Sequence, residues 1–224
     1  MRLNHLLLIL PMTAALAVST PVRGQSTSSS DPQALEVLER AGARYAAVSG
    51  LCADFEQVIE VTLLGETKRS RGRLCQQPPN LFLMDFTEPA GDLVVADGES
   101  LWIYYPSTDD KQVFRQALGS GGNLDFHREF LADPGVKYQA TYEAQETSGD
   151  AVLHVIAIVP NAPASYELAR IWVDEASGLI HRVILEEENG SIRNVALSNL
   201  DVNPVLDRAL FSFTPPPGAN VLER

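Results

Sequence analysis

The sequence predicts a mainly β protein built on one large antiparallel sheet. From Leu51 onward, stretches rich in β-branched and aromatic residues follow one another, separated by turn sequences such as Asp97-Gly98 and Asn189-Gly190. A chain of 224 residues, 45% of them hydrophobic, can bury a sizeable core in one domain. Hairpins in such succession form a meander, and so wide a sheet must curl toward a barrel or be covered on one face.

The N-terminus has the layout of a secretory signal peptide. Arg2 precedes an apolar stretch that begins at Leu6, and a polar region follows that ends near Gly24. The apolar stretch is too short for a membrane-spanning helix, so we expect residues 1–24 to be cleaved and residues 25–30 to form a flexible lead. The mature protein is then exported and soluble.

An amphipathic helix is predicted directly after this lead. Asp31 can cap it, and Pro32 suits its first turn. Apolar residues recur along one side of the helix, at Leu35, Leu38, Ala41 and Tyr45. Such a helix needs a partner surface.

The only two cysteines, Cys52 and Cys75, are expected to form a disulfide, because an exported protein folds in an oxidising compartment. A hairpin in which paired residue numbers sum to 127 supports this bond. It pairs Cys52 with Cys75, Asp54 with Arg73, and Glu56 with Arg71, and it places Ala53, Leu74 and Phe55 on the opposite, apolar face. The turn near Gly65 does not fit this register cleanly, so we expect a β-bulge there.

The later part of the chain predicts five strands and one short helix. The strands are expected at residues 137–145, 151–159, 166–174, 179–187 and 191–200. A glycine-rich loop at 119–122 leads into the apolar helix at 123–132, which is expected to end at Asp133-Pro134-Gly135.

Composition and motifs point away from nucleic acids, metals and cofactors. The net charge is −12 and no basic stripe is present, which disfavours a nucleic-acid partner. His127, His154 and His181 each lack a second histidine or cysteine at metal-ligand spacing. No catalytic or cofactor-binding motif occurs, so we expect no catalytic residue, no metal and no cofactor.

The many apolar residues of the sheet allow two interpretations. They fill a packed β-sandwich or barrel core, or they line a cavity that takes an apolar ligand. Residue patterns alone do not decide between a filled barrel and a ligand-binding one.

An ordered set of short motifs resembles the outer-membrane lipoprotein carrier (LolA) family. The motifs are Phe55-x-Gln57, Gly72-Arg73-Leu74, Pro79-Asn80-Leu81-Phe82, Glu88-Pro89, residues 94–106, and Phe211-Ser212-Phe213-Thr214-Pro215-Pro216. The resemblance runs from the signal peptide to Val221 and is weakest between Gly119 and Pro163. It implies that residues 31–224 form an incomplete antiparallel β-barrel, in which the N-terminal helix and short lid helices cover an apolar cavity.

The resemblance also implies a periplasmic, non-enzymatic carrier that acts as a monomer. Such a carrier takes the acyl chains of lipoproteins from an inner-membrane ABC-type lipoprotein-releasing complex and passes them to an outer-membrane lipoprotein acceptor. By position, the lipid-binding cavity is assigned to Phe55, Leu74, Phe82, Met84, Phe86, Trp102 and Tyr104. The lid is assigned to Leu124, Phe126, Phe130 and Leu131.

One position departs from the family pattern. Many members carry a basic residue, linked to lid closure, where this chain has Pro78. Proline has neither charge nor donor, so Arg73, Arg69 or Arg115 replaces that residue or the lid closes differently.

Other functions remain open at this point. A related half-barrel can bind another acylated lipid or a glycolipid, or serve as an acceptor or envelope-stress sensor. A periplasmic hydrolase with dispersed carboxylates is the enzymatic alternative, and it requires a polar cleft with two strongly perturbed acids.

Overall fold

The computed structural model describes residues 30–118 and 127–223, which form one twelve-stranded sheet with four short or medium helices. The strands are β1 (Leu51–Val61), β2 (Glu66–Gln77), β3 (Leu81–Glu88), β4 (Ala90–Asp97), β5 (Ser100–Tyr104), β6 (Gln112–Ala117), β7 (Tyr138–Ser148), β8 (Ala151–Pro160), β9 (Tyr166–Asp174), β10 (Ile180–Glu187), β11 (Ile192–Val202) and β12 (Asn220–Glu223). The helices are α1 (Pro32–Ala46), η1 (His127–Leu131), α2 (Pro134–Lys137) and η2 (Arg208–Phe211). The predicted signal peptide and lead lie outside the described residues except for Ser30.

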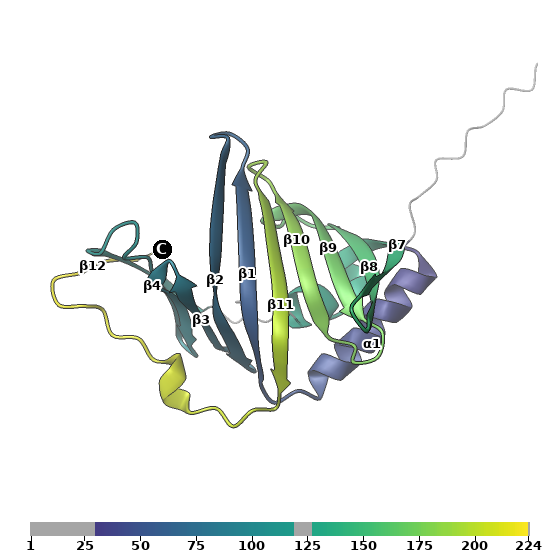
Figure 1. Cartoon of the computed structure of the whole chain (residues 1–224), viewed down its shortest axis with the longest axis horizontal. Helices are drawn as coiled ribbons and strands as arrows, with labels where there is room; N and C mark the ends of the chain where they lie inside the picture. Colours follow the sequence, from purple (N-terminus) through teal and green to yellow (C-terminus); the bar gives the residue numbers. More distant parts are fainter. Residues whose placement is uncertain (1–29, 119–126, 224) are drawn as a thin grey trace, which may run out of the picture.

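Two antiparallel meanders make up the sheet. One runs from β1 to β6 and the other from β7 to β11, and the pairing of β1 with β11 joins them. The sheet is curved and open, with β7 and β12 at its edges (Figure 1). The mainly β fold and the incomplete barrel are therefore confirmed, whereas the parallel pairing of β12 with β6 was not predicted.

Helix α1 forms where its sequence predicts it. The Asp31 carboxylate accepts a hydrogen bond from the Gln33 backbone N–H at 2.9 Å, and Pro32 is the first helical residue. The predicted stripe is buried apart from the half-buried Leu35, and α1 lies across the β7–β10 end of the sheet (Figure 1).

The β1–β2 hairpin has the predicted register and the disulfide. Cys52 faces and bonds to Cys75, and Asp54 makes an ion pair with Arg73 at 2.9 Å. Arg71 forms its ion pair with Glu88 of β3 at 2.7 Å. The predicted bulge near the turn is wrong: pairing continues unbroken to the last residues of the two strands, and a four-residue turn at 62–65 closes the hairpin.

The described part of the predicted apolar helix is η1, which ends at Leu131, just before the predicted stop at Asp133-Pro134-Gly135. Asp133 adopts a left-handed conformation with φ of 54°, which separates η1 from the next helix. That next helix, α2, was not predicted; it begins at Pro134, because proline is well tolerated in a first helical turn.

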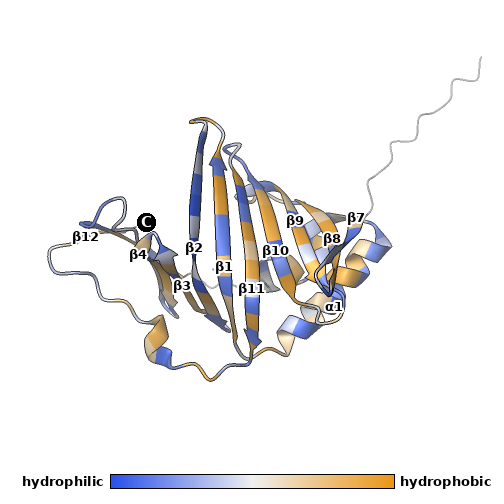
Figure 2. Cartoon of the chain, viewed as in Figure 1, coloured by the Kyte–Doolittle hydropathy of each residue, from blue (hydrophilic) through white to orange (hydrophobic). Residues whose placement is uncertain are grey.

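Apolar clusters lie on both faces of the sheet. Along β11, by contrast, hydrophobic and hydrophilic residues alternate (Figure 2), so there the two faces differ in polarity. We call the face that carries α1 the inner face. One inner cluster packs under α1 and a second lies on β1–β5 and β11; Val183 of the first is paired with Val195 of the second, so both share this face. The outer face carries the disulfide, which Phe211 of η2 covers.

Candidate functional site

The second inner cluster, which we call the apolar wall, is the candidate ligand-binding surface. Five of the seven residues assigned to the cavity lie in it: Phe55, Leu74, Phe82, Met84 and Phe86. The wall also contains Ala53, Val94, Ala96, Leu101, Leu118, Val195, Leu197 and Leu200. All of them come from strands β1–β5 and β11 except Leu118, so strand geometry positions the surface.

A glycine in β2 allows the aromatic rings of the wall to meet. Gly72 is paired with Phe55 on one side and Phe86 on the other. A Cβ atom at Gly72 would lie 2.0 Å from the Asp85 carbonyl oxygen, so no larger residue fits. The Phe55 and Phe86 rings instead pack edge to face at 5.1 Å, and Tyr105 extends the row at 6.0 Å from Phe86.

The other two assigned cavity residues, Trp102 and Tyr104, are not brought together with these five. Both lie on the outer face, where the Phe213 ring is 5.8 Å from Trp102 and 5.7 Å from Tyr104. On β5 it is Leu101 that joins the wall. Every residue from Leu101 to Tyr104 is apolar or aromatic, so the sequence pattern does not indicate which of these side chains face the wall. The aromatic residues at 211 and 213 were the sequence feature that could have indicated a second covered face.

The described lid residues pack on the other inner cluster. Phe130 and Leu131 are buried under α1, and the Phe130 ring lies 6.0 Å from that of Tyr166. The Tyr166 hydroxyl donates to the Glu129 carboxylate at 2.9 Å, which anchors η1 to β9. Leu124 and Phe126 lie outside the described residues.

The three arginines considered in place of Pro78 all lie on the outer face. Arg73 is paired with Asp54 and Arg69 with Val58, on the face opposite Phe55. The Arg115 guanidinium stacks 5.0 Å over the Trp102 ring. In this structure none of the three faces the wall.

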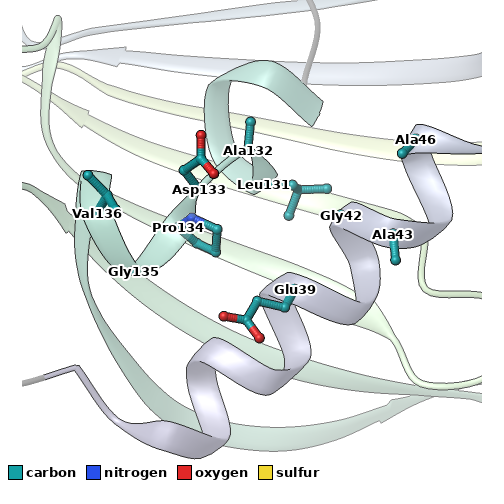
Figure 3. Close-up of a pocket in the computed structure, with 10 residues that line it drawn as sticks. All are labelled: Glu39, Gly42, Ala43, Ala46, Leu131, Ala132, Asp133, Pro134, Gly135 and Val136. Atoms are coloured by element: carbon teal, nitrogen blue, oxygen red, sulfur yellow. The ribbon is translucent and has the colours of Figure 1, made fainter.

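A surface pocket of about 550 Å³ lies between α1 and the η1–α2 segment (Figure 3). In it the Leu131 side chain extends toward α1 near Gly42. A second pocket of about 490 Å³ lies around Tyr138 and Tyr166, and a third of about 470 Å³ lies beside Leu185. Wall residues line none of these three.

Electrostatic effects reach the edge of the wall at Tyr105. Burial raises the pKa of its hydroxyl, the positive charge of Arg193 opposes that rise, and the negative charge of Asp92 adds to it. Within residues 30–118 and 127–223, no group of three or more histidine, cysteine or carboxylate side chains could hold a metal ion. No helix in the same part of the chain is long and apolar enough to cross a membrane.

Residues 46–214 match the family model described as outer membrane lipoprotein carrier protein LolA. The chain belongs to this family. A LolA-family relative from Legionella pneumophila (strain Lens), named outer-membrane lipoprotein carrier protein, is 27% identical over 178 residues, which cover 80% of this chain and 85% of the relative. One of the same name from Chromobacterium violaceum is 27% identical over 217 residues, covering 96% of this chain and 97% of the relative.

A solved structure supports the fold. The crystal structure of an uncharacterised conserved protein from Thermus thermophilus superposes with a TM-score of 0.56 at 13% identity, covering 86% of this chain and 99% of that one. The open sheet described above is thus shared with a distant protein.

Proposed function

We propose that this protein is a periplasmic carrier that holds the acyl chains of lipoproteins against its apolar wall. The observation that carries the proposal is the family match over residues 46–214, supported by relatives named for lipoprotein carriage. The wall supplies apolar side chains for such a ligand, because Phe55, Leu74 and Phe86 lie on one continuous strand face, where they are 1%, 1% and 6% exposed.

The physical need for such a carrier is clear. Exposing an acyl chain to water costs about 0.8 kcal/mol per CH₂, so a lipoprotein with several chains does not cross an aqueous compartment unaided. A carrier covers the chains while its own acidic surface, with a net charge of −12 for the whole chain, keeps the complex dissolved.

The family resemblance implies the route of the cargo. Cargo is received from an inner-membrane ABC-type lipoprotein-releasing complex and delivered to an outer-membrane lipoprotein acceptor. The protein acts by binding and release, and we place no chemical step in it. The predicted signal peptide at residues 1–24 favours export, and we assign the carrier to residues 31–224.

Co-purification tests this function directly. The mature protein is isolated from the periplasm without detergent and extracted, and bound acylated molecules are identified by mass spectrometry. Two neighbouring half-buried residues on opposite faces provide matched variants: Leu101→Glu in the wall and Trp102→Glu outside it. Circular dichroism confirms that both variants are folded.

The expected result is acylated lipoprotein bound to the natural protein and to Trp102→Glu, and lost from Leu101→Glu. Loss from both variants alike would overturn the assignment of the wall. Absence of cargo from the natural protein, together with failure to take up a fluorescent fatty acid, would overturn the carrier function.

A further inference from the structure

A row of polar side chains crosses the inner face beside the apolar wall. We call Ser70, Gln57, Arg193 and Glu187 the polar band; they come from β2, β1, β11 and β10, which are adjacent in the sheet. The Gln57 amide donates to the Ser70 hydroxyl at 3.1 Å. The Arg193 guanidinium donates to the Gln57 carbonyl oxygen at 3.1 Å and to the Glu187 carboxylate at 2.8 Å.

The strand register places this band on the same face as the wall. Gln57 is paired with Val195, a wall residue, and it follows Phe55 by two positions on β1. Arg193 precedes Val195 by two positions on β11. Because alternate residues of a strand share a face, Gln57 and Arg193 continue the wall directly.

The side chains of the polar band are partly buried and held by hydrogen bonds rather than free in solvent. Gln57 is only 8% exposed, and the side chains of Glu187 and Arg193 are 19% and 35% exposed. Arg193 and Glu187 border the pocket of about 470 Å³ beside Leu185. Hydrogen bonds on both sides fix the guanidinium, so it is ordered before any ligand arrives.

The charges of the band indicate what it can recognise. The Arg193 cation is matched by the Glu187 anion 2.8 Å away, so the row as a whole attracts neither anions nor cations strongly. Its chemistry is that of directed N–H and O–H donors. The Ser70 hydroxyl accepts the bond from Gln57, which leaves the serine proton to be donated to a ligand oxygen.

We propose that the polar band binds the ester and amide carbonyl groups that join the acyl chains of a bound lipid to its head. This inference rests on the proposed function: the hydrocarbon lies on the wall, and its carbonyl end meets Ser70, Gln57 and Arg193. Neutral carbonyl oxygens suit a charge-balanced row of donors, whereas a phosphate group would meet Glu187 as well. The band thereby fixes how far along the sheet an acyl chain can extend.

A pair of ligands tests the proposal without altering the protein. One is a synthetic diacylglyceryl lipopeptide with ester-linked chains, and the other is its dialkyl ether analogue, which has the same hydrocarbon but lacks the ester carbonyls. We expect the natural protein to bind the ester form about tenfold more tightly, as two further hydrogen bonds provide. Isothermal titration calorimetry or displacement of a fluorescent fatty acid measures both affinities.

Variants then locate the effect. Arg193→Met keeps a long apolar stem but removes the donors, and it should bring the ratio of ester to ether affinity from about ten to about one. Arg182→Met is the matched control. Arg182 of β10 lies on the outer face, with its guanidinium 4.8 Å from the centre of the Trp172 ring. Like Arg193, it donates a hydrogen bond through Nε to a neighbouring strand, in this case to Asn194 at 2.9 Å. It should keep the preference.

The outcomes separate the two proposals. Equal affinity of the natural protein for ester and ether ligands would overturn the role of the band while leaving the carrier function intact. Binding of neither ligand would overturn the carrier function itself. An ester preference that survives in Arg193→Met but is lost in the Gln57→Leu, Ser70→Ala double variant would overturn the role of Arg193 and leave the carbonyl site with the other two residues.

Discussion

Replacing Phe211 with alanine should destabilise the protein strongly without weakening acyl binding. The Phe211 side chain is 1% exposed and packs from η2 onto the outer face, against the disulfide, Leu83 and Val95. Truncating a buried phenylalanine to alanine costs about 3–5 kcal/mol. Because a domain of this kind is stable by about 5–15 kcal/mol, the loss is a large fraction of the total. At about 2–4 °C per kcal/mol, Tm should fall by roughly 6–20 °C.

A second variant calibrates this expectation. Phe213→Ala removes a partly exposed ring that contacts Trp102 and Tyr104, so it should cost only about 1–3 kcal/mol. Urea unfolding followed by tryptophan fluorescence and by circular dichroism measures both free energies of unfolding.

Acyl binding is the second half of the test. Both phenylalanines lie on the opposite face from the wall, so each folded variant should bind a fluorescent fatty acid as tightly as the natural protein. A loss of less than about 1 kcal/mol for Phe211→Ala would contradict the packing argument. A tenfold weaker affinity in the folded state would contradict the separation of the two faces.

Three further predictions concern the hairpin, the wall and the stability of the protein at low pH. Reducing the disulfide, which links residues 23 apart, should lower the free energy of unfolding by about 3 kcal/mol. Urea titration with and without reductant measures this change. An unchanged free energy of unfolding would contradict the argument that the disulfide restricts the unfolded chain. Gly72→Ala should cost about 3 kcal/mol or more and shift the amide resonances of β2 and β3, because its methyl group would collide with the Asp85 carbonyl; a variant of natural stability would refute this close approach. Burial alone would raise the pKa of Asp174, but the hydroxyl and N–H of Ser177 donate to the carboxylate at 2.6 and 2.7 Å and hold its pKa below 3.8. This carboxylate therefore stabilises the fold above pH 3.8 and loses that effect as the pH falls through its folded pKa. The Tm of Asp174→Asn should then fall less between about pH 4 and 2 than the Tm of the natural protein. Parallel plots of Tm against pH for the two proteins would refute this assignment.

Local chemistry made the β1–β2 hairpin predictable. The cysteines and the opposite charges at Asp54 and Arg73 agree on a single register, and a shift of one residue would separate both pairs. The start of α1 and its buried side were predictable for the same reason, since the cap at Asp31 directly precedes the apolar stripe.

Non-local features were not predictable from these patterns. The pairing of β1 with β11 joins segments about 140 residues apart, and no local signal selects it. The pattern also did not decide which residues of β5 face the wall, because both faces of this strand have apolar neighbours. Trp102 packs against Phe213 on the outer face, and Leu101 packs in the wall. A second covered face removes the polar alternation on which such assignments depend.

The two halves of the inner face are built for different tasks in the proposed carrier. Where α1 packs on the sheet, residues such as Leu38, Ile156 and Ile171 are fully buried within the protein itself, so this half contributes stability whether or not cargo is present. The outer cluster around Phe211 does the same from the other side. The apolar wall is buried as well, with Phe55 and Leu74 each 1% exposed. In the proposed carrier an acyl chain therefore competes with contacts that the wall already makes within the protein. This competition lowers the net affinity for cargo and so favours its release.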